Sequence, residues 1–237
     1  MDNLEKFIDI HSHVLPGLDD GPRDVESAME ILRLAAMNQI GDIICTPHYI
    51  DGKSKYAPEQ IDELINKLTV RIIDEGLGIK LHSGNEIFYT ETALSALEGG
   101  QAKTLAASDF VLVEFAPWVR WQEMVEGLYH LKSAGYHPIL AHTERYECLI
   151  KGRSERELVH TLREYGFMIQ INAEAVMEKT KFTKYVLKNE LADFVATDTH
   201  SSRTRGPYLK AAGAYLNKKY GTGYTSRLLY ENARKLF

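Results

Sequence analysis

The 237-residue chain has only two cysteines, Cys45 and Cys148. Two thiols so far apart in the sequence provide neither a disulfide framework nor a cysteine zinc site. They also do not fit the Cys-x5-Arg loop in which a catalytic thiolate and an arginine hold phosphate. No arginine follows Cys45 at that spacing, and Arg153 follows Cys148 one residue too early. We therefore do not expect catalysis by a thiolate.

The chain also has no excess of positive charge and no long apolar run. Lys and Arg total 28 against 33 Asp and Glu, which gives a net charge of -5 and argues against broad attraction to nucleic acid or anionic membranes. No segment reaches membrane-spanning length, and the first ten residues lack the cationic start and apolar stretch of a secretory signal. We expect a cytoplasmic protein with no nucleic-acid partner and no membrane insertion.

What the sequence does contain is a regular alternation of apolar strand-like runs with amphipathic helical runs, which is typical of a parallel sheet built from βα units. Helices are expected, for example, at residues 25–38, 58–75 and 121–134, and residues 207–237 are expected to form two helices that break near Gly221 and Gly223. The expected strands are residues 7–13, 42–46, 79–84, 110–115, 138–142, 168–172 and 194–197. Seven units favour a barrel over an open sheet, and the chain has neither linker nor repeat. We therefore expect residues 1–237 to form a single α/β domain.

The first expected strand ends in a pair of histidines, His11 and His13. Side chains alternate along a strand, so Asp9, His11 and His13 are expected to point to one face and to bring two imidazoles together. A histidine pair at this spacing indicates a metal site, although isolated histidines often only form local hydrogen bonds.

Residue types that bind metals also follow most of the other expected strands. They are His48, Glu86, Glu114, His142, Asp198 and His200. In barrels, functional residues gather at the carboxyl ends of the strands, and buried carboxylates are costly unless they are paired or bound to metal. With His11, His13 and Asp20, these residues exceed what one ion coordinates, so more than one ion is expected. Imidazole and carboxylate donors without thiolate suit Mn, Fe or Zn.

Two arginines lie just beyond these candidate ligands. Arg145 follows His142 by three residues, and Arg205 follows His200 by five. A guanidinium matches phosphate oxygens in a bidentate fork, although an ordinary salt bridge is an equal alternative for each arginine. Clustered metals with arginines nearby indicate hydrolysis of a phosphorylated substrate by a metal-activated hydroxide.

These motifs together resemble the bacterial manganese-dependent protein-tyrosine phosphatases of the polymerase and histidinol phosphatase (PHP) superfamily, which regulate capsule and exopolysaccharide synthesis. The resemblance spans most of the chain. The segments that carry it are D-I-H-S-H at residues 9–13, D-D-G-P at 19–22, T-P-H-Y at 46–49, G-N-E-I at 84–87, V-E-F at 113–115, A-H-T-E-R-Y at 141–146 and T-D-T-H at 197–200.

The resemblance implies a distorted (β/α)7 barrel that holds three divalent metal ions, with manganese expected and iron or zinc as alternatives. It also implies that Arg145 and Arg205 bind phosphate, and that the substrate is the phosphotyrosine-containing tail of a bacterial tyrosine kinase. The implied ligands are His11, His13, Glu86 and Asp198 for the first ion, Glu86, Glu114 and His142 for the second, and Asp20, His48 and His200 for the third.

Other functions remain as alternatives at this point. A PHP enzyme for a small metabolite such as histidinol phosphate shares the metals and the fold, although Asp20 and Glu114 favour the tyrosine-phosphatase branch. A metal-dependent amide or ester hydrolase leaves the arginines without a clear purpose, and a non-catalytic, metal-stabilised binding protein is the remaining alternative. On the loop after Glu114, we expect Trp118 and Trp121 to pack rather than to line a substrate path. The oligomeric state is left open.

Overall fold

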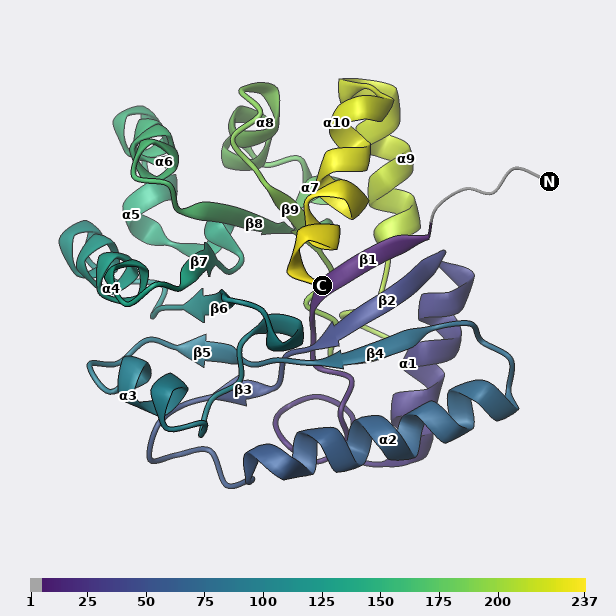
Figure 1. Cartoon of the computed structure of the whole chain (residues 1–237). Helices are drawn as coiled ribbons and strands as arrows, with labels where there is room; N and C mark the ends of the chain where they lie inside the picture. The colour runs from purple at the N-terminus through teal and green to yellow at the C-terminus, as the bar shows by residue number, and fades with distance from the viewer. Residues whose placement is uncertain (1–5) are drawn as a thin grey trace.

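The computed structural model describes residues 6–237 as a curled sheet of parallel strands with helices around its outside (Figure 1). The strands are β1 (Phe7–Ser12), β2 (Ile40–Cys45), β3 (His48–Tyr49), β4 (Lys80–Ser83), β5 (Glu86–Phe88), β6 (Phe110–Glu114), β7 (His137–Leu140), β8 (Met168–Asn172) and β9 (Phe194–Ala196). Every strand expected from the sequence is present, with ends that differ by at most two residues. The short strands β3 and β5 were not expected.

The strands pair in the orders β1-β2-β4 and β3-β5-β6-β7-β8-β9. Only Thr46 and Pro47 separate β2 from β3, and proline has no N–H to donate to a neighbouring strand. The end of β1 meets the segment after β9, because the His13 amide donates to the Thr199 carbonyl at 2.9 Å and the Asp198 amide donates to the His11 carbonyl at 2.8 Å. Residues from both ends of the chain thus meet at one place.

The helices are α1 (Val25–Met37), α2 (Pro58–Asp74), α3 (Ala93–Glu98), α4 (Trp121–Ser133), α5 (Glu147–Ile150), α6 (Arg153–Glu164), α7 (Ala173–Glu178), α8 (Lys181–Lys188), α9 (Leu209–Tyr220) and α10 (Thr222–Ser226). Asp24 caps the N-terminus of α1, because its side chain accepts a hydrogen bond from the Ser27 amide at 2.8 Å. α2 begins at Pro58, where a missing N–H costs nothing. The expected break at Gly221 is confirmed, because this residue has φ of 87° and separates α9 from α10.

Apolar side chains form two layers. Most of them fill the space between the strands and the helices. A smaller cluster joins alternate strand residues such as Ile8, Ile10, Leu112 and Ile139 to Leu236 near the C-terminus, and Figure 1 shows the C-terminal segment lying beside β1. On β6, Glu114 lies two residues after Leu112 and therefore points to the same side of the sheet. There it contributes to the site described below.

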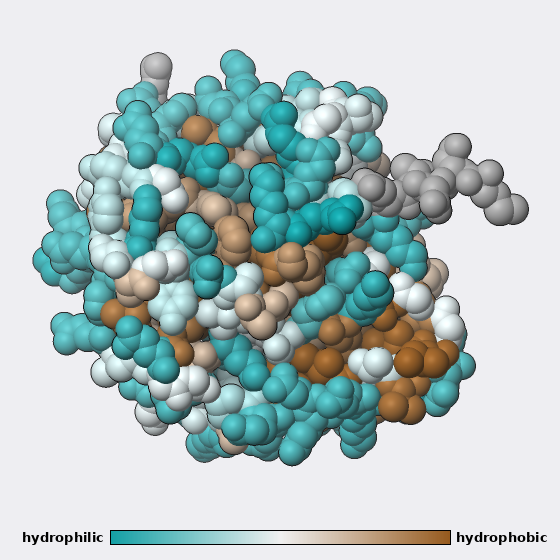
Figure 2. Space-filling model, viewed as in Figure 1, coloured by the Kyte–Doolittle hydropathy of each residue, from teal (hydrophilic) through white to brown (hydrophobic). Residues whose placement is uncertain are grey.

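The surface is mixed in polarity. Figure 2 shows an apolar area on the side of the molecule where α2 lies, and α2 carries two exposed aliphatic side chains, Val70 and Ile73. No helix within residues 6–237 has both the length and the apolar character needed to cross a membrane.

Candidate metal centre and phosphate-binding site

The two histidines at the end of β1 point their Nε2 atoms at each other across 3.2 Å. His11 Nδ1 lies 3.2 Å from Gln170 Oε1, and His13 Nδ1 lies 2.7 Å from Asp19 Oδ2. Because both oxygens can only accept hydrogen bonds, each Nδ1 carries the proton and each Nε2 presents a lone pair. Two lone pairs that converge at this distance fit a cation between them.

Two buried carboxylates complete this first group. Glu86 Oε2 lies 3.2 Å from both Nε2 atoms, and Asp198 Oδ1 lies 3.4 Å from both. One ligand atom from each of the four side chains lies within 4.8 Å of the others. The Asp9 carboxylate does not join them, because it accepts hydrogen bonds from the Thr197 amide at 2.9 Å and from the Thr197 hydroxyl.

Glu86 also belongs to a second group. Its Oε1 lies 2.7 Å from His142 Nε2, and Glu114 Oε2 lies 3.6 Å from the same nitrogen. His48 Nδ1 lies 3.0 Å from both Glu86 Oε2 and Glu114 Oε1. The three residues implied for the second ion are therefore in contact, and His48 lies closer to them than the sequence suggested.

A third group lies on the more exposed side of the cluster. Asp20 Oδ1 is 3.1 Å from His200 Nε2 and 3.6 Å from His48 Nε2. His200 Nδ1 donates to the Asp198 carbonyl at 2.9 Å, so its Nε2 carries a lone pair. The His13 ring stacks on the His200 ring at 3.9 Å, which joins this group to the first. All nine residues predicted as metal ligands thus form one continuous cluster.

The donor set in this cluster fits divalent metal ions. The atoms that face the neighbouring ligands include three that are buried without a hydrogen bond, namely Glu86 Oε2, His48 Nδ1 and His200 Nε2. Unpaired buried polar atoms are costly unless something binds them. Burial alone would raise the pKa of Glu86, but its interactions with the neighbouring His11 and His142 outweigh burial and hold this pKa well below its usual range. The Glu86 carboxylate is therefore ionised and able to bind cations.

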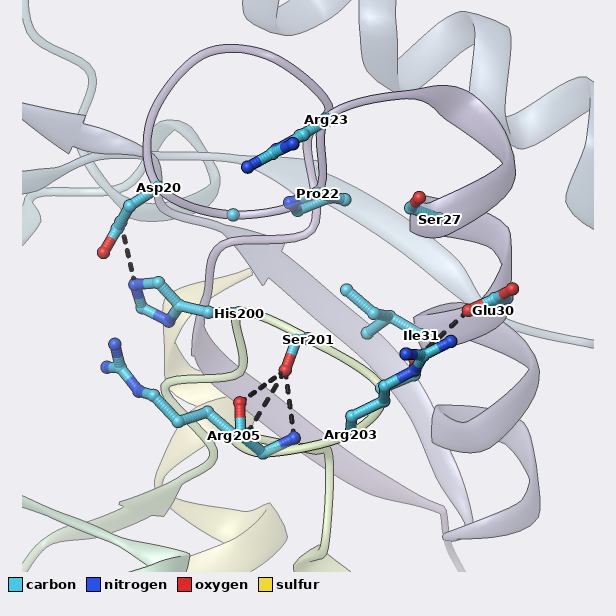
Figure 3. A pocket seen from close by; sticks show the side chains of 13 residues that line it. Asp20, Pro22, Arg23, Ser27, Glu30, Ile31, His200, Ser201, Arg203 and Arg205 are labelled. Atoms are coloured by element: carbon cyan, nitrogen blue, oxygen red, sulfur yellow. Dashed lines mark hydrogen bonds and ion pairs between the residues drawn. The ribbon is translucent and has the colours of Figure 1, made fainter.

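Both predicted phosphate-binding arginines reach the edge of the cluster. Arg145 Nη2 lies 2.7 Å and Arg205 Nη2 lies 2.5 Å from the same oxygen, Asp198 Oδ2. Their side chains are 40% and 32% exposed, whereas Asp198 is buried, so each guanidinium has donors left for a ligand. In Figure 3 the Arg205 side chain extends toward His200 and Asp20.

The chain matches the family model described as capsular polysaccharide synthesis, CpsB/CapC, over residues 7–237. It belongs to the CpsB/CapC family. The tyrosine-protein phosphatase CpsB of Streptococcus pneumoniae is 33% identical over 242 residues, covering 97% of this chain and 98% of that protein. The tyrosine-protein phosphatase YwqE of Bacillus subtilis is 32% identical, covering 97% of this chain and 91% of that protein.

Solved structures support the same assignment. A structure described as YwqE from Bacillus subtilis and CpsB from Streptococcus pneumoniae, unique metal-dependent tyrosine phosphatases, matches with a TM-score of 0.87 at 30% identity, covering 97% of this chain and 93% of that chain. A histidinol phosphate phosphatase from Lactococcus lactis matches with a TM-score of 0.57 at 16% identity, covering 91% and 94%, which shows a shared fold alone. The resemblance to capsule-regulating tyrosine phosphatases is thus confirmed.

Three further residues of this CpsB/CapC-family chain hold candidate ligands, and the sequence did not single them out. The first is Asp19, which accepts hydrogen bonds from His13 Nδ1, from the Gly21 amide at 2.9 Å and from the His48 amide at 3.1 Å. Burial opposes its charge, but these hydrogen bonds lower the pKa of Asp19 to about 2. A Cβ on Gly21 would lie 2.3 Å from the His13 carbonyl oxygen, so the loop can approach this closely only with glycine.

The other two residues are Gln170 and Asn172, which lie two positions apart on β8 and act through their side-chain amides. Gln170 Oε1 accepts from the His142 amide at 2.7 Å as well as from His11, and its Nε2 donates to Asn172 Oδ1 at 2.8 Å. Asn172 Nδ2 donates to Asp198 Oδ2 at 2.9 Å. His142 and Asp198 both have positive φ, 29° and 52°, a costly conformation for residues other than glycine, so β8 stabilises two strained positions.

Glu144, the two cysteines and the two tryptophans do not join the cluster of candidate ligands. Glu144 accepts from the Asn172 amide at 3.1 Å, and therefore supports β8 rather than a ligand directly. Burial raises the pKa of both thiols, that of Cys148 to about 11, which agrees with the absence of thiolate chemistry. Trp121 packs against the apolar core as expected. For Trp118 that expectation was wrong, because its side chain is 73% exposed on the loop between β6 and α4.

Proposed function

We propose that this protein is a metal-dependent protein-tyrosine phosphatase that acts in capsule or exopolysaccharide synthesis. The observation that carries the proposal is the cluster of nine imidazole and carboxylate side chains with Arg145 and Arg205 at its edge. Relatives that match almost the whole chain are tyrosine-protein phosphatases. The proposed fold is a single-domain, distorted (β/α)7 barrel, in which β2 with β3 and β4 with β5 each count as one interrupted strand.

The three groups of side chains would each hold one divalent ion, with manganese preferred and iron or zinc as alternatives. We assign His11, His13, Glu86 and Asp198 to the first ion, Glu86, Glu114 and His142 to the second, and Asp20, His48 and His200 to the third. When bound, the ions would activate a water molecule for attack on phosphorus and neutralise charge on the phosphoryl group. The shared Glu86 carboxylate supports this arrangement, because its two oxygens face different groups.

The protein's own residues would orient the substrate. Arg145 and Arg205 would bind two phosphoryl oxygens with the donors that Asp198 leaves free, and this fixes phosphorus beside the ligand cluster. A phenol is a fair leaving group with a pKa of about 10, so the demand for a general acid is small. Phosphotyrosine in the tail of a bacterial tyrosine kinase is the proposed substrate.

One experiment compares three substrates with protein purified without chelators, whose metal content is measured by mass spectrometry. With Mn restored, we expect hydrolysis of a phosphotyrosyl peptide and much slower turnover of histidinol phosphate and of an acyl ester. Faster turnover of histidinol phosphate would assign the protein to small metabolites, and turnover of no phosphoester would leave a metal-stabilised binding protein.

The same assay tests the ligand assignment through His142→Ala. Removing a ligand should lower kcat at least about a hundredfold and reduce the bound metal, because even the outer partners of ligands contribute ten- to a hundredfold. His160→Ala is the matched control, since His160 lies on α6 with its ring against Tyr185, away from the cluster. Near-normal turnover of His142→Ala with full metal content would refute the assignment.

A further inference from the structure

A hollow of about 610 Å³ opens directly beside the candidate metal centre (Figure 3). Three of its lining residues, Asp20, His200 and Arg205, belong to the site described above. The hollow continues away from them between the loop that precedes α1 and the loop that follows β9, where Arg23 and Arg203 line it. If a substrate residue is bound at the metal centre, the residues next to it in the substrate chain would therefore reach this hollow.

Arg23 and Arg203 differ from the other arginines of the protein. Among arginine side chains that the structure describes, these two alone have no ion pair, hydrogen bond or ring contact with another residue. The others are satisfied, as in the pairs of Arg33 with Glu75 and Arg163 with Asp193, or by the contact of Arg234 with Tyr230. Both unpartnered guanidinium groups thus line a single hollow, which opens next to the phosphate-binding Arg205.

The carboxylates along this hollow do not neutralise the two arginines. Asp20 is engaged with His200. Glu30, on α1, accepts a hydrogen bond from the Ser202 hydroxyl at 3.2 Å and forms no ion pair among the described residues. Three arginines, Arg23, Arg203 and Arg205, line the hollow against two carboxylates, Asp20 and Glu30, so the hollow keeps a net positive charge in a chain whose net charge is -5. Guanidinium groups without an internal partner are suited to bind carboxylate or phosphate from a ligand.

We propose that this hollow, which we call the arginine hollow, binds an acidic or phosphorylated residue that flanks the phosphotyrosine of the substrate. The inference rests on the proposed function, because it needs phosphotyrosine at the metal centre. Arg23 and Arg203 contact none of the candidate ligands, so they take no part in metal binding. Their role in the proposal is to recognise the substrate. The enzyme accordingly prefers phosphotyrosine in segments rich in Glu, Asp or further phosphotyrosine.

The test uses full-length, metal-loaded protein and matched phosphotyrosyl peptides. One set carries a Glu at successive positions on either side of the phosphotyrosine, another carries Gln at the same positions, and a third carries a second phosphotyrosine. The wild-type protein should favour the Glu or doubly phosphorylated peptides over the Gln peptides. In Arg23→Gln/Arg203→Gln, kcat/KM for the favoured peptides should fall about three- to tenfold, as expected for two exposed charge pairs. Turnover of Gln peptides and of p-nitrophenyl phosphate should not change.

Arg203→Glu provides an independent variant, which should shift the preference toward peptides that carry Lys in place of Glu. Arg234→Gln is the matched control, because this arginine is near the C-terminus and contacts Tyr230. An equal loss with acidic and neutral peptides, or a loss with p-nitrophenyl phosphate, would overturn the proposal. So would a wild-type protein that hydrolyses all peptides equally, which would leave the proposed function intact.

Failure of the proposed function itself is distinguishable, because it would appear as no hydrolysis of any phosphoester by the wild-type protein. Binding of fluorescent peptides, measured by anisotropy, then tests the hollow without turnover. Tighter binding of acidic peptides by the wild type than by Arg23→Gln/Arg203→Gln supports the hollow, and equal binding overturns it.

Discussion

At the scale of single residues, the site depends on which ring nitrogen of each histidine is protonated. Asp19 and Gln170 accept from the Nδ1 atoms of His13 and His11, which leaves both Nε2 lone pairs facing the centre of the cluster. The Asp198 carbonyl does the same for His200. The protein's own hydrogen bonds therefore fix the orientation of these imidazoles.

The two thiols lead to a prediction that separates this chemistry from thiolate catalysis. Burial raises the pKa of Cys148 to about 11 and that of Cys45 still higher, so at pH 7.5 both are protonated and unreactive. We expect iodoacetamide to leave phosphatase activity unchanged at pH 7.5. Alkylation of Cys148, followed by mass spectrometry, should increase only as the pH rises toward 11, because the thiolate forms on the alkaline side. Rapid loss of activity at pH 7.5, protected by phosphate, would argue for a catalytic thiol.

At the scale of elements, β8 supplies no candidate ligand, and yet its amides contact the side chain of His11, the backbone of His142 and the side chain of Asp198. We predict that Gln170→Ala and Asn172→Ala each weaken Mn binding about ten- to a hundredfold, because they release ligands from fixed orientations. Isothermal titration of the metal-free variants measures this directly and does not depend on activity.

If the β8 amides contributed only to stability, their loss would not change the affinity for Mn more than the loss of an amide elsewhere. Asn232→Ala removes a comparable amide, whose Nδ2 donates to the Asp193 carbonyl at 3.0 Å away from the cluster. This control should lose stability, by about 1 kcal/mol for one hydrogen bond, and should keep its affinity for Mn. Equal Mn affinities in the β8 variants and in Asn232→Ala would show that β8 contributes only to stability.

Helices and strands could be predicted from the sequence where they are long enough to show a hydrophobic period. The alternation of apolar runs and helical periods located the strands, and strand ends located the candidate ligands other than Asp20. β3 and β5 are two and three residues long, too short for any period to be visible. Gln170 and Asn172 were missed because amides do not resemble metal ligands, and their role depends on neighbours that only the fold brings together. The same holds for Arg23 and Arg203, which lie 180 residues apart in the sequence.

At the scale of the whole molecule, the cluster gathers residues from β1 to the segment after β9, so it connects both ends of the chain. Asp20, Glu86, Glu114 and Asp198 bring four carboxylates into one cluster that exists only in the folded chain, so ions bound there would couple metal binding to folding. The overall charge of -5 therefore does not describe the site. With three divalent ions bound, the four carboxylates would leave it positive by about two charges, which suits a phosphate dianion.

This coupling predicts that metal removal lowers the stability of the entire protein. At a Mn concentration about a hundred times its Kd, binding to the folded state alone contributes about 2.7 kcal/mol, and for a chain of this size that raises Tm by about 5–10 °C. Scanning calorimetry of metal-stripped protein, before and after Mn is added, measures the shift. In His13→Ala the shift should be small, because His13 is a candidate ligand of the first ion and its ring stacks on His200 of the third group, whereas His160→Ala should retain it. The same Tm with and without Mn, in protein shown to be metal-free at the start, would mean that the cluster does not bind ions tightly enough to link the two ends of the chain.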